Sequence, residues 1–192
     1  MLTLLRHAET DFNRDPKRFQ GRRETSISAS GAADAKRFGQ RSAKYDGVVC
    51  SPALRCRQTV QALGLPEVVR RHEPRLVEID VGRWEGCLHA DVAETDGAAY
   101  RAWISSPEWC CPGGGESLQD MRCRVLAAIR ELQSEFTGCR GLVVTHGGPI
   151  RIVRIEIERR SLNEFHQLQV PNLGCVDLPD ACTLGTLGEV PR

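Results

Sequence analysis

A short apolar run at residues 1–5 stops abruptly at Arg6 and His7. An apolar run of this length, bounded by charged residues, predicts a buried strand. The run 142–145 ends in the same way, directly before His146. Because open α/β sheets place their ligands at the carboxyl ends of their strands, we expect both histidines to belong to one site on two neighbouring strands.

Strand and helix patterns alternate along the rest of the chain. Further strands are predicted at 46–50, 68–69, 175–178 and 182–187, and helices at 30–43 (capped by Ser30), 52–62 (opened by Pro52), 117–136 and from Pro149 onward. Residues 88–116 interrupt this order, with one or two helices within 91–103 and a Pro- and Gly-rich loop at 105–115. We expect one domain over residues 1–192 with an α/β fold: a three-layer sandwich whose central sheet is mainly parallel, with helices on both faces and a lid-like insertion at 88–116.

Composition narrows the choice of partner. Of the 192 residues, 41% are hydrophobic and 27% are charged, as in soluble globular proteins, and the formal net charge is +1. This charge gives no reason to expect nucleic acid or an anionic membrane as the partner. No apolar run approaches the roughly 20 residues that cross a bilayer, and Arg6, His7 and Glu9 interrupt the first run too early for a signal peptide. We expect a cytoplasmic protein, monomeric or homodimeric, whose partner is a small molecule.

The nine cysteines do not form a recognisable framework. Their number is odd and no Cys-x-x-Cys pair occurs, so we interpret them as small hydrophobic residues in a reducing compartment. The adjacent pair Cys110 and Cys111 is able to oxidise, and its role stays open.

Several polar residues near the two histidines are suited to phosphate chemistry. An imidazole is a good nucleophile for a phosphoryl group, and the planar fork of Arg6 matches phosphate geometry. Asn13 offers amide donors, and Gly147 offers backbone N–H groups at a helix start. A lone histidine at a strand end is more often structural, so it is the combination that indicates a site.

A basic loop follows Gly21. Gly21 and Arg22 are candidate substrate-binding residues. Arg22 and Arg23 either contact a second anionic group of a substrate or form a solvated, flexible surface. Of the other histidines, His89 opens the insertion and either lines the pocket entrance or, as is more usual for such a residue, takes no part in the site. His72 is expected on the surface, and His166 without a role.

Five ordered blocks carry a resemblance to a known family. They are Leu5–Thr10 with Asn13, Ser51–Thr59, Leu76–Gly86, Gly115–Leu118 and Thr145–Gly147. In this order, and over the chain up to about Arg154, they resemble the histidine phosphatase superfamily, which includes the cofactor-dependent phosphoglycerate mutases.

The resemblance implies a role for each motif residue. His7 would be the nucleophile that takes the phosphoryl group, while Arg6, Arg55 and His146 would hold the phosphate oxygens. Glu78 would protonate the leaving alkoxide and then deprotonate water, with Glu85 as a competing acid nearby. Neither a metal nor a cofactor is expected.

Two departures from the family pattern bear on the reaction. Ala8 replaces the usual glycine of the first motif, and Trp103-Ile104-Ser105 stands where mutases carry Trp-Arg-Arg. The missing arginine pair favours hydrolysis, and the short chain resembles small bacterial phosphatases such as the α-ribazole phosphatases. We therefore predict a metal-independent phosphomonoesterase that forms a phosphohistidine, acting on α-ribazole-5′-phosphate or on many esters. The alternatives are a phosphoglycerate mutase, a protein phosphohistidine phosphatase and a non-catalytic phosphate-binding module.

Overall fold

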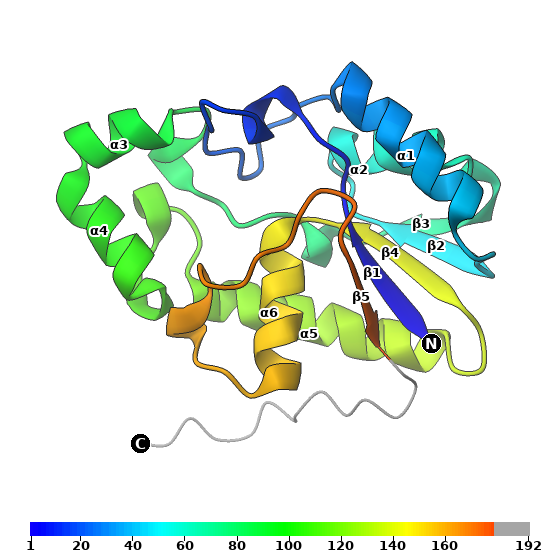
Figure 1. The fold of residues 1–192 in the computed structure, drawn as a ribbon. Helices are drawn as coiled ribbons and strands as arrows, with labels where there is room; N and C mark the ends of the chain where they lie inside the picture. The colour runs from blue at the N-terminus through cyan, green and yellow to red at the C-terminus, as the bar shows by residue number, and fades with distance from the viewer. Residues whose placement is uncertain (179–192) are drawn as a thin grey trace.

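Five strands form one sheet in the computed structural model, which describes residues 1–178 (Figure 1). The strands are β1 (Leu2–Arg6), β2 (Gly47–Cys50), β3 (Val69–His72), β4 (Gly141–Thr145) and β5 (Cys175–Leu178). Their order across the sheet is β3-β2-β4-β1-β5. All neighbouring pairs are parallel except β1 with β5. The predicted mainly parallel sheet is confirmed, and the strand predicted at 182–187 lies outside the described residues.

Helices cover both faces of the sheet. They are α1 (Ala29–Arg41), α2 (Leu54–Leu63), α3 (His89–Thr95), α4 (Gly97–Ser105), α5 (Leu118–Glu135) and α6 (Gly147–Glu158). In Figure 1, α1 lies above the sheet, α5 and α6 lie below it, and α3 and α4 stand apart at the left. The three-layer arrangement predicted from the alternating pattern is therefore confirmed.

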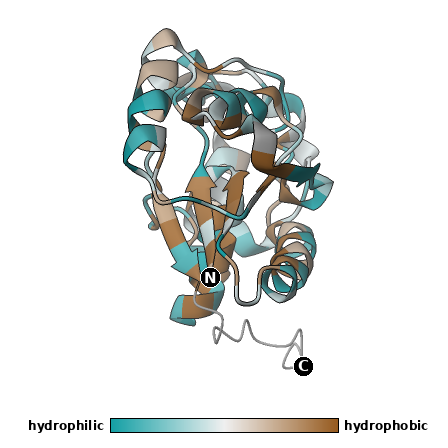
Figure 2. Cartoon of the chain, turned by 90° about the vertical axis from the view of Figure 1, so that its right-hand side faces the viewer, coloured by the Kyte–Doolittle hydropathy of each residue, from teal (hydrophilic) through white to brown (hydrophobic). Residues whose placement is uncertain are grey.

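The three inner strands, β1, β2 and β4, contribute side chains to two separate cores. Val143 of β4 joins Leu4 and the apolar face of α5, whereas Val144 joins Leu5 and the side chains of α1 and α2. Successive side chains of a strand point to opposite faces, so a strand covered on both sides must be apolar throughout. Figure 2 shows the result as hydrophobic strands in the middle of the molecule.

Three helix starts differ from the sequence prediction. The cap of α1 is Ser28 rather than Ser30, because the Ser28 side chain accepts a hydrogen bond from the backbone of Gly31 at 3.0 Å. Helix α2 begins at Leu54, two residues after Pro52. Helix α6 begins at Gly147 instead of Pro149, with His146 as its cap. Proline is tolerated in the first helical turn, where backbone N–H groups lack helical partners, so it marks a helix start only to within a few residues.

Residues 88–116 fold into more regular structure than predicted. Helices α3 and α4 account for the helical part, and the expected loop contains two 3-10 turns, Pro107–Trp109 and Pro112–Gly114. Trp103 of α4 is buried. Its ring packs at a tilt against Phe165 and edge-to-face against His166. This segment therefore contacts the chain that follows α6, and the space between them is the site described next.

Candidate active site

The two strand-ending histidines lie side by side. Strand β1 pairs with β4 so that Arg6 is opposite Thr145, and the next residue of each strand is a histidine. The rings of His7 and His146 are 5.3 Å apart between centroids, at 67° to each other, and both are buried. The neighbouring strand ends thus bring the two histidines together as the sequence predicts.

His7 is held as a neutral imidazole. Its Nδ1–H donates to the carbonyl oxygen of Ala8 at 2.7 Å, which leaves Nε2 without a hydrogen bond among residues 1–178. Burial, and then the positive charges of Arg55 and Arg6, hold the pKa of His7 well below its usual value. A neutral ring whose second nitrogen is free has the electronic form that a nucleophile requires.

The His7 ring lines a cavity of about 240 Å³ that we call the reaction cavity. Arg6 lies in its wall, at the end of β1, where Nη1 donates to the carbonyl of Val170 at 2.5 Å. The buried Nε atom of Arg6 has no hydrogen-bond partner in the described part of the chain. Burial lowers the pKa of Arg6, and the negative charge of Glu78 opposes that shift. An unpaired buried donor on a cation is a ready contact for a phosphate oxygen.

Arg55, on α2, is fully buried and ties three segments together. Its Nε donates to Nδ1 of His146 at 3.1 Å, and its terminal nitrogens donate to the carbonyls of Arg23 and Gly21 at 2.9 and 2.7 Å. Because Nδ1 of His146 accepts this bond, the ring proton lies on Nε2 and is donated to the Ser51 hydroxyl at 2.8 Å. His146 therefore orients Arg55, and both of its own ring nitrogens are bonded to protein.

Glu78 lies in the wall of the reaction cavity with its carboxylate fixed by backbone donors. One oxygen accepts from the backbone N–H of Ile79 at 2.9 Å, and the other from that of Gly148 at 3.1 Å. The helix start that we predicted to bind an anion through Gly147 thus holds this carboxylate through the next residue. A Cβ atom on Gly148 would lie 2.1 Å from a Glu78 oxygen, so glycine is required for the close approach.

Glu85, the competing acid, has a different environment. Its two carboxylate oxygens accept from the backbone N–H groups of Arg22 and Arg23 at 2.7 and 3.0 Å. Its role in this structure is to fold the basic loop, and it is absent from the wall of the reaction cavity, which contains Glu78.

The substrate-binding residues predicted from the sequence divide into two groups. Asn13 and Gly21 lie in the wall of the reaction cavity. Gly147 lies at the start of α6, and the guanidinium of Arg6 packs beside the Gly147 backbone. Arg22 instead points to acidic side chains, with nitrogen–oxygen distances of 3.6 Å to Asp80 and 3.4 Å to Glu116. The basic loop therefore contributes Gly21, and not the guanidinium of Arg22, to the cavity.

Three further residues, two histidines and an arginine, line the reaction cavity. Of the two alternatives for His89, the structure shows the one at the cavity, with the ring stacked on Phe19 at 3.9 Å. His166 also lines the cavity, although no role is predicted for it from the sequence. Arg151 of α6, which sequence reasoning missed, lines the cavity as well. Arg151 comes four residues after Gly147, one helical turn along the same face, and this spacing is the signal that would have identified it.

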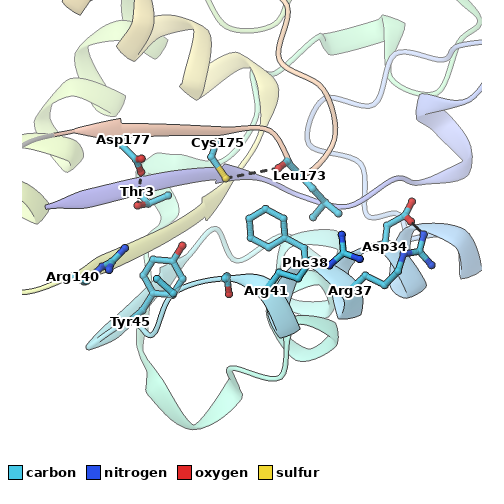
Figure 3. A pocket seen from close by; sticks show the side chains of 12 residues that line it. Thr3, Asp34, Arg37, Phe38, Arg41, Tyr45, Arg140, Leu173, Cys175 and Asp177 are labelled. Carbon is cyan, nitrogen blue, oxygen red and sulfur yellow. Dashed lines mark hydrogen bonds and ion pairs between the residues drawn. The ribbon is translucent and has the colours of Figure 1, made fainter.

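Two of the other cavities in the described part of the molecule bear on the location of the site. One, of about 610 Å³, adjoins the reaction cavity and shares Arg6, Asn13, Arg18, His89 and Arg151 with it. We call it the outer cleft. The other, of about 480 Å³, lies between α1 and β5, where Figure 3 shows Phe38, Arg41 and Tyr45 around it. The pocket in Figure 3 shares no residue with the reaction cavity, so the chemistry belongs to the reaction cavity and the outer cleft.

Residues 1–178 contain no group of three or more His, Cys, Asp and Glu side chains that is arranged to hold a metal ion. In the same part of the chain, no helix has the length and apolar character that crossing a bilayer requires.

Comparison with known proteins shows the same chemistry. The chain matches the family model of the histidine phosphatase superfamily (branch 1) over residues 2–179. A metal-independent phosphoserine phosphatase from Arabidopsis thaliana is 32% identical over 168 residues, which are 83% of this chain and 69% of that protein. A glucosyl-3-phosphoglycerate phosphatase from Mycolicibacterium vanbaalenii is 33% identical over 163 residues, 78% of this chain and 70% of that protein. The crystal structure of the α-ribazole phosphatase from Shigella flexneri matches with a TM-score of 0.80 and 26% identity, covering 98% of this chain and 96% of that one.

The family match extends over nearly the whole chain, and relatives at 32% and 33% identity are named as phosphatases of phosphate esters. This chain belongs to the histidine phosphatase superfamily and is a phosphomonoesterase.

Proposed function

We propose that this enzyme hydrolyses small phosphate monoesters through a phosphohistidine on His7. The observation that carries the proposal is the state of the His7 ring: neutral, fixed through Nδ1, and facing a cavity that also contains Arg6 and Glu78. Nε2 of His7 attacks phosphorus, the ester P–O bond breaks, and Glu78 gives its proton to the leaving alkoxide.

The second half of the reaction reverses the proton transfer. Water attacks the phosphohistidine, Glu78 takes its proton, the P–N bond breaks, and inorganic phosphate leaves with His7 restored. Arg6 stabilises the negative charge on the transferring phosphoryl group. Arg55 uses three of its five N–H donors for hydrogen bonds to protein, so two N–H groups remain available. One of the three bonds, to His146, holds Arg55 in place.

The ester is a small molecule. Helices α3 and α4 and the chain after α6 enclose the reaction cavity, and its volume of about 240 Å³ suits a phosphoryl group with a compact alcohol. Phosphoserine, glucosyl-3-phosphoglycerate and α-ribazole phosphate, the substrates in the names of the relatives, are the first candidates. Ile104 and Ser105 stand where a mutase would need arginines, which supports transfer to water over transfer to phosphoglycerate.

The test is phosphate release from these esters and from p-nitrophenyl phosphate, measured in EDTA. We expect release by the wild type and none by His7→Ala, while His72→Ala, an exposed histidine at the end of β3, retains it. Rapid acid-free quenching with a ³²P-labelled ester should trap a base-stable, acid-labile phosphoenzyme in the wild type. Release that persists in His7→Ala would contradict the proposal.

A further inference from the structure

Among the described residues of the cavity wall, Arg151 is the one half-buried cation to which the proposed mechanism gives no role. Its Nε donates to the carbonyl of Leu168 at 2.9 Å, and its guanidinium lies over the Phe165 ring, 5.1 Å from the centroid. Among residues 1–178 its two terminal nitrogens donate to no protein atom, and it forms no salt bridge. Four N–H donors are thus held in a fixed plane with nothing to bind.

The residues that line the cavities around Arg151 carry more positive than negative charges. The reaction cavity and the outer cleft together carry Arg6, Lys17, Arg18 and Arg151 in their walls, and Glu78 is the only carboxylate among the residues that line them. Burial lowers the pKa of Arg151 and the charge of Glu78 opposes this, as it does for Arg6. A single carboxylate therefore compensates two half-buried arginines, which favours the binding of anions.

The charge of a bound ester does not remove this imbalance. A phosphate monoester is close to a dianion at neutral pH, which matches Arg6 and Arg55. When Glu78 carries the proton that it gives to the leaving group, it no longer compensates Arg151. Apart from the exposed Lys17 and Arg18, one positive charge then remains in the wall: Arg151, four residues along α6 from the glycine beside Arg6.

His166 supplies a second unsatisfied group at the same wall. Its Nε2 atom is buried and has no hydrogen-bond partner in the described chain, and the ring packs edge-on against Trp103 at 4.8 Å. A buried polar atom without a partner is costly, and it indicates a ligand group that completes the site.

We propose that the enzyme prefers phosphate monoesters whose alcohol carries a carboxylate, and that Arg151 binds this carboxylate through its planar fork. A carboxylate has the single negative charge that matches the one remaining cation, and its two oxygens match the guanidinium geometry. The adjoining outer cleft gives room for the rest of the alcohol. The inference rests on the proposed hydrolysis at His7 and adds the substrate class.

The experiment compares pairs of esters that differ only in the carboxylate: O-phosphoserine with O-phosphoethanolamine, and 3-phosphoglycerate with glycerol 1-phosphate. A charge-assisted hydrogen bond to a buried group contributes enough to raise kcat/KM about 10- to 100-fold for the carboxylated member. In Arg151→Gln the ratio within each pair should fall to about 1, mainly through a higher KM for the carboxylated ester. Arg41→Gln removes the same charge from the end of α1, in the pocket of Figure 3, and should keep the wild-type ratio.

Arg151→Lys is the second variant, because it keeps the charge and the packed stem but loses the fork. It should fold as the wild type does and give a ratio between those of wild type and Arg151→Gln. A wild-type ratio near 1, or an equal loss for both members of a pair in Arg151→Gln and Arg151→Lys, would overturn the inference while hydrolysis that depends on His7 stands. If no ester of the panel releases phosphate, the proposed function itself fails.

Discussion

Arg124 makes an unusually complete set of contacts, and its replacement gives a quantitative test of how the acid segment is held. From α5, its Nη1 donates to the carbonyls of Arg75 and Val77, both at 2.7 Å, and its Nη2 donates to that of Glu78 at 3.2 Å. Its Nε and Nη2 donate to the two oxygens of Glu116 at 2.6 and 2.7 Å. All five N–H donors of the guanidinium are used, three of them on the segment that carries Glu78.

The change is Arg124→Met, and the structure sets its cost. The Glu116 side chain is 10% exposed, so the substitution leaves a buried carboxylate without its main partner, which costs about 3 to 5 kcal/mol. The lower part of this range applies, since Arg22 lies 3.4 Å from Glu116 and compensates part of the charge. We expect the free energy of unfolding, measured by urea denaturation at pH 7, to fall by about 3 kcal/mol.

A matched control separates this effect from the loss of any arginine. Arg154 pairs with Glu158 four residues away on α6, and both side chains are partly exposed. Arg154→Met should cost less than about 1 kcal/mol. Adding Glu116→Gln to Arg124→Met should restore about half of the lost stability, because no unpaired charge then remains.

The activity of Arg124→Met should fall as well, because the segment that carries Glu78 loses the hydrogen bonds that position it. We expect kcat to drop at least tenfold. Equal unfolding free energies for Arg124→Met and Arg154→Met would refute the argument, because the buried network would then contribute no more than a surface pair.

Three further predictions concern the cavity. Gly148→Ala should displace the Glu78 carboxylate and lower kcat about 100-fold for alkyl phosphates, but much less for p-nitrophenyl phosphate, whose leaving group needs no proton; equal losses would contradict the general-acid role. Burial lowers the pKa of His166 from about 6.5 in the unfolded chain to about 4 in the folded chain. Between these pH values the unfolded chain binds more protons than the folded chain. The free energy of unfolding therefore falls as the pH drops below 6.5. From pH 7.5 to 5 this amounts to about 2 kcal/mol, which unfolding curves of His166→Gln should lack. ¹⁵N NMR of the free enzyme should show the His7 ring still neutral at pH 6; a midpoint at or above 6.5 would contradict its environment.

The sheet and the two histidines could be predicted because local pattern determines them. Both faces of the central strands are covered, so neighbouring residues that point to opposite faces are all apolar. Examples are Leu4, Leu5, Val143 and Val144, and the result is a continuous apolar run in the sequence. A polar residue directly after such a run then marks the sheet edge, which is how His7 was located.

The remaining site residues depend on tertiary contacts that a single sequence does not reveal. Arg22 and Arg151 are both arginines in ordinary surroundings along the chain, yet Arg22 meets Asp80 and Glu116 whereas Arg151 faces the cavity. His166 follows α6 by eight residues, and it reaches the cavity only because Trp103 packs against it. The motifs of the family therefore predict the residues to which the proposed mechanism gives a role, whereas Arg151 and His166 follow only from the three-dimensional structure.

The arginines have two effects on the reaction, and the two effects reinforce each other. Arg6 and Arg55 attract the ester dianion, and the same positive charges lower the pKa of His7 and keep its Nε2 lone pair free. A protonated His7 would add a further cation to a site whose only carboxylate is Glu78, so the empty site favours the neutral nucleophile. Neutralising Arg6 should therefore weaken ester binding and raise the pKa of His7 together. Arg151 acts differently in this account: it is absent from the charges that shift His7, so its loss should change substrate preference while the His7 pKa stays in place.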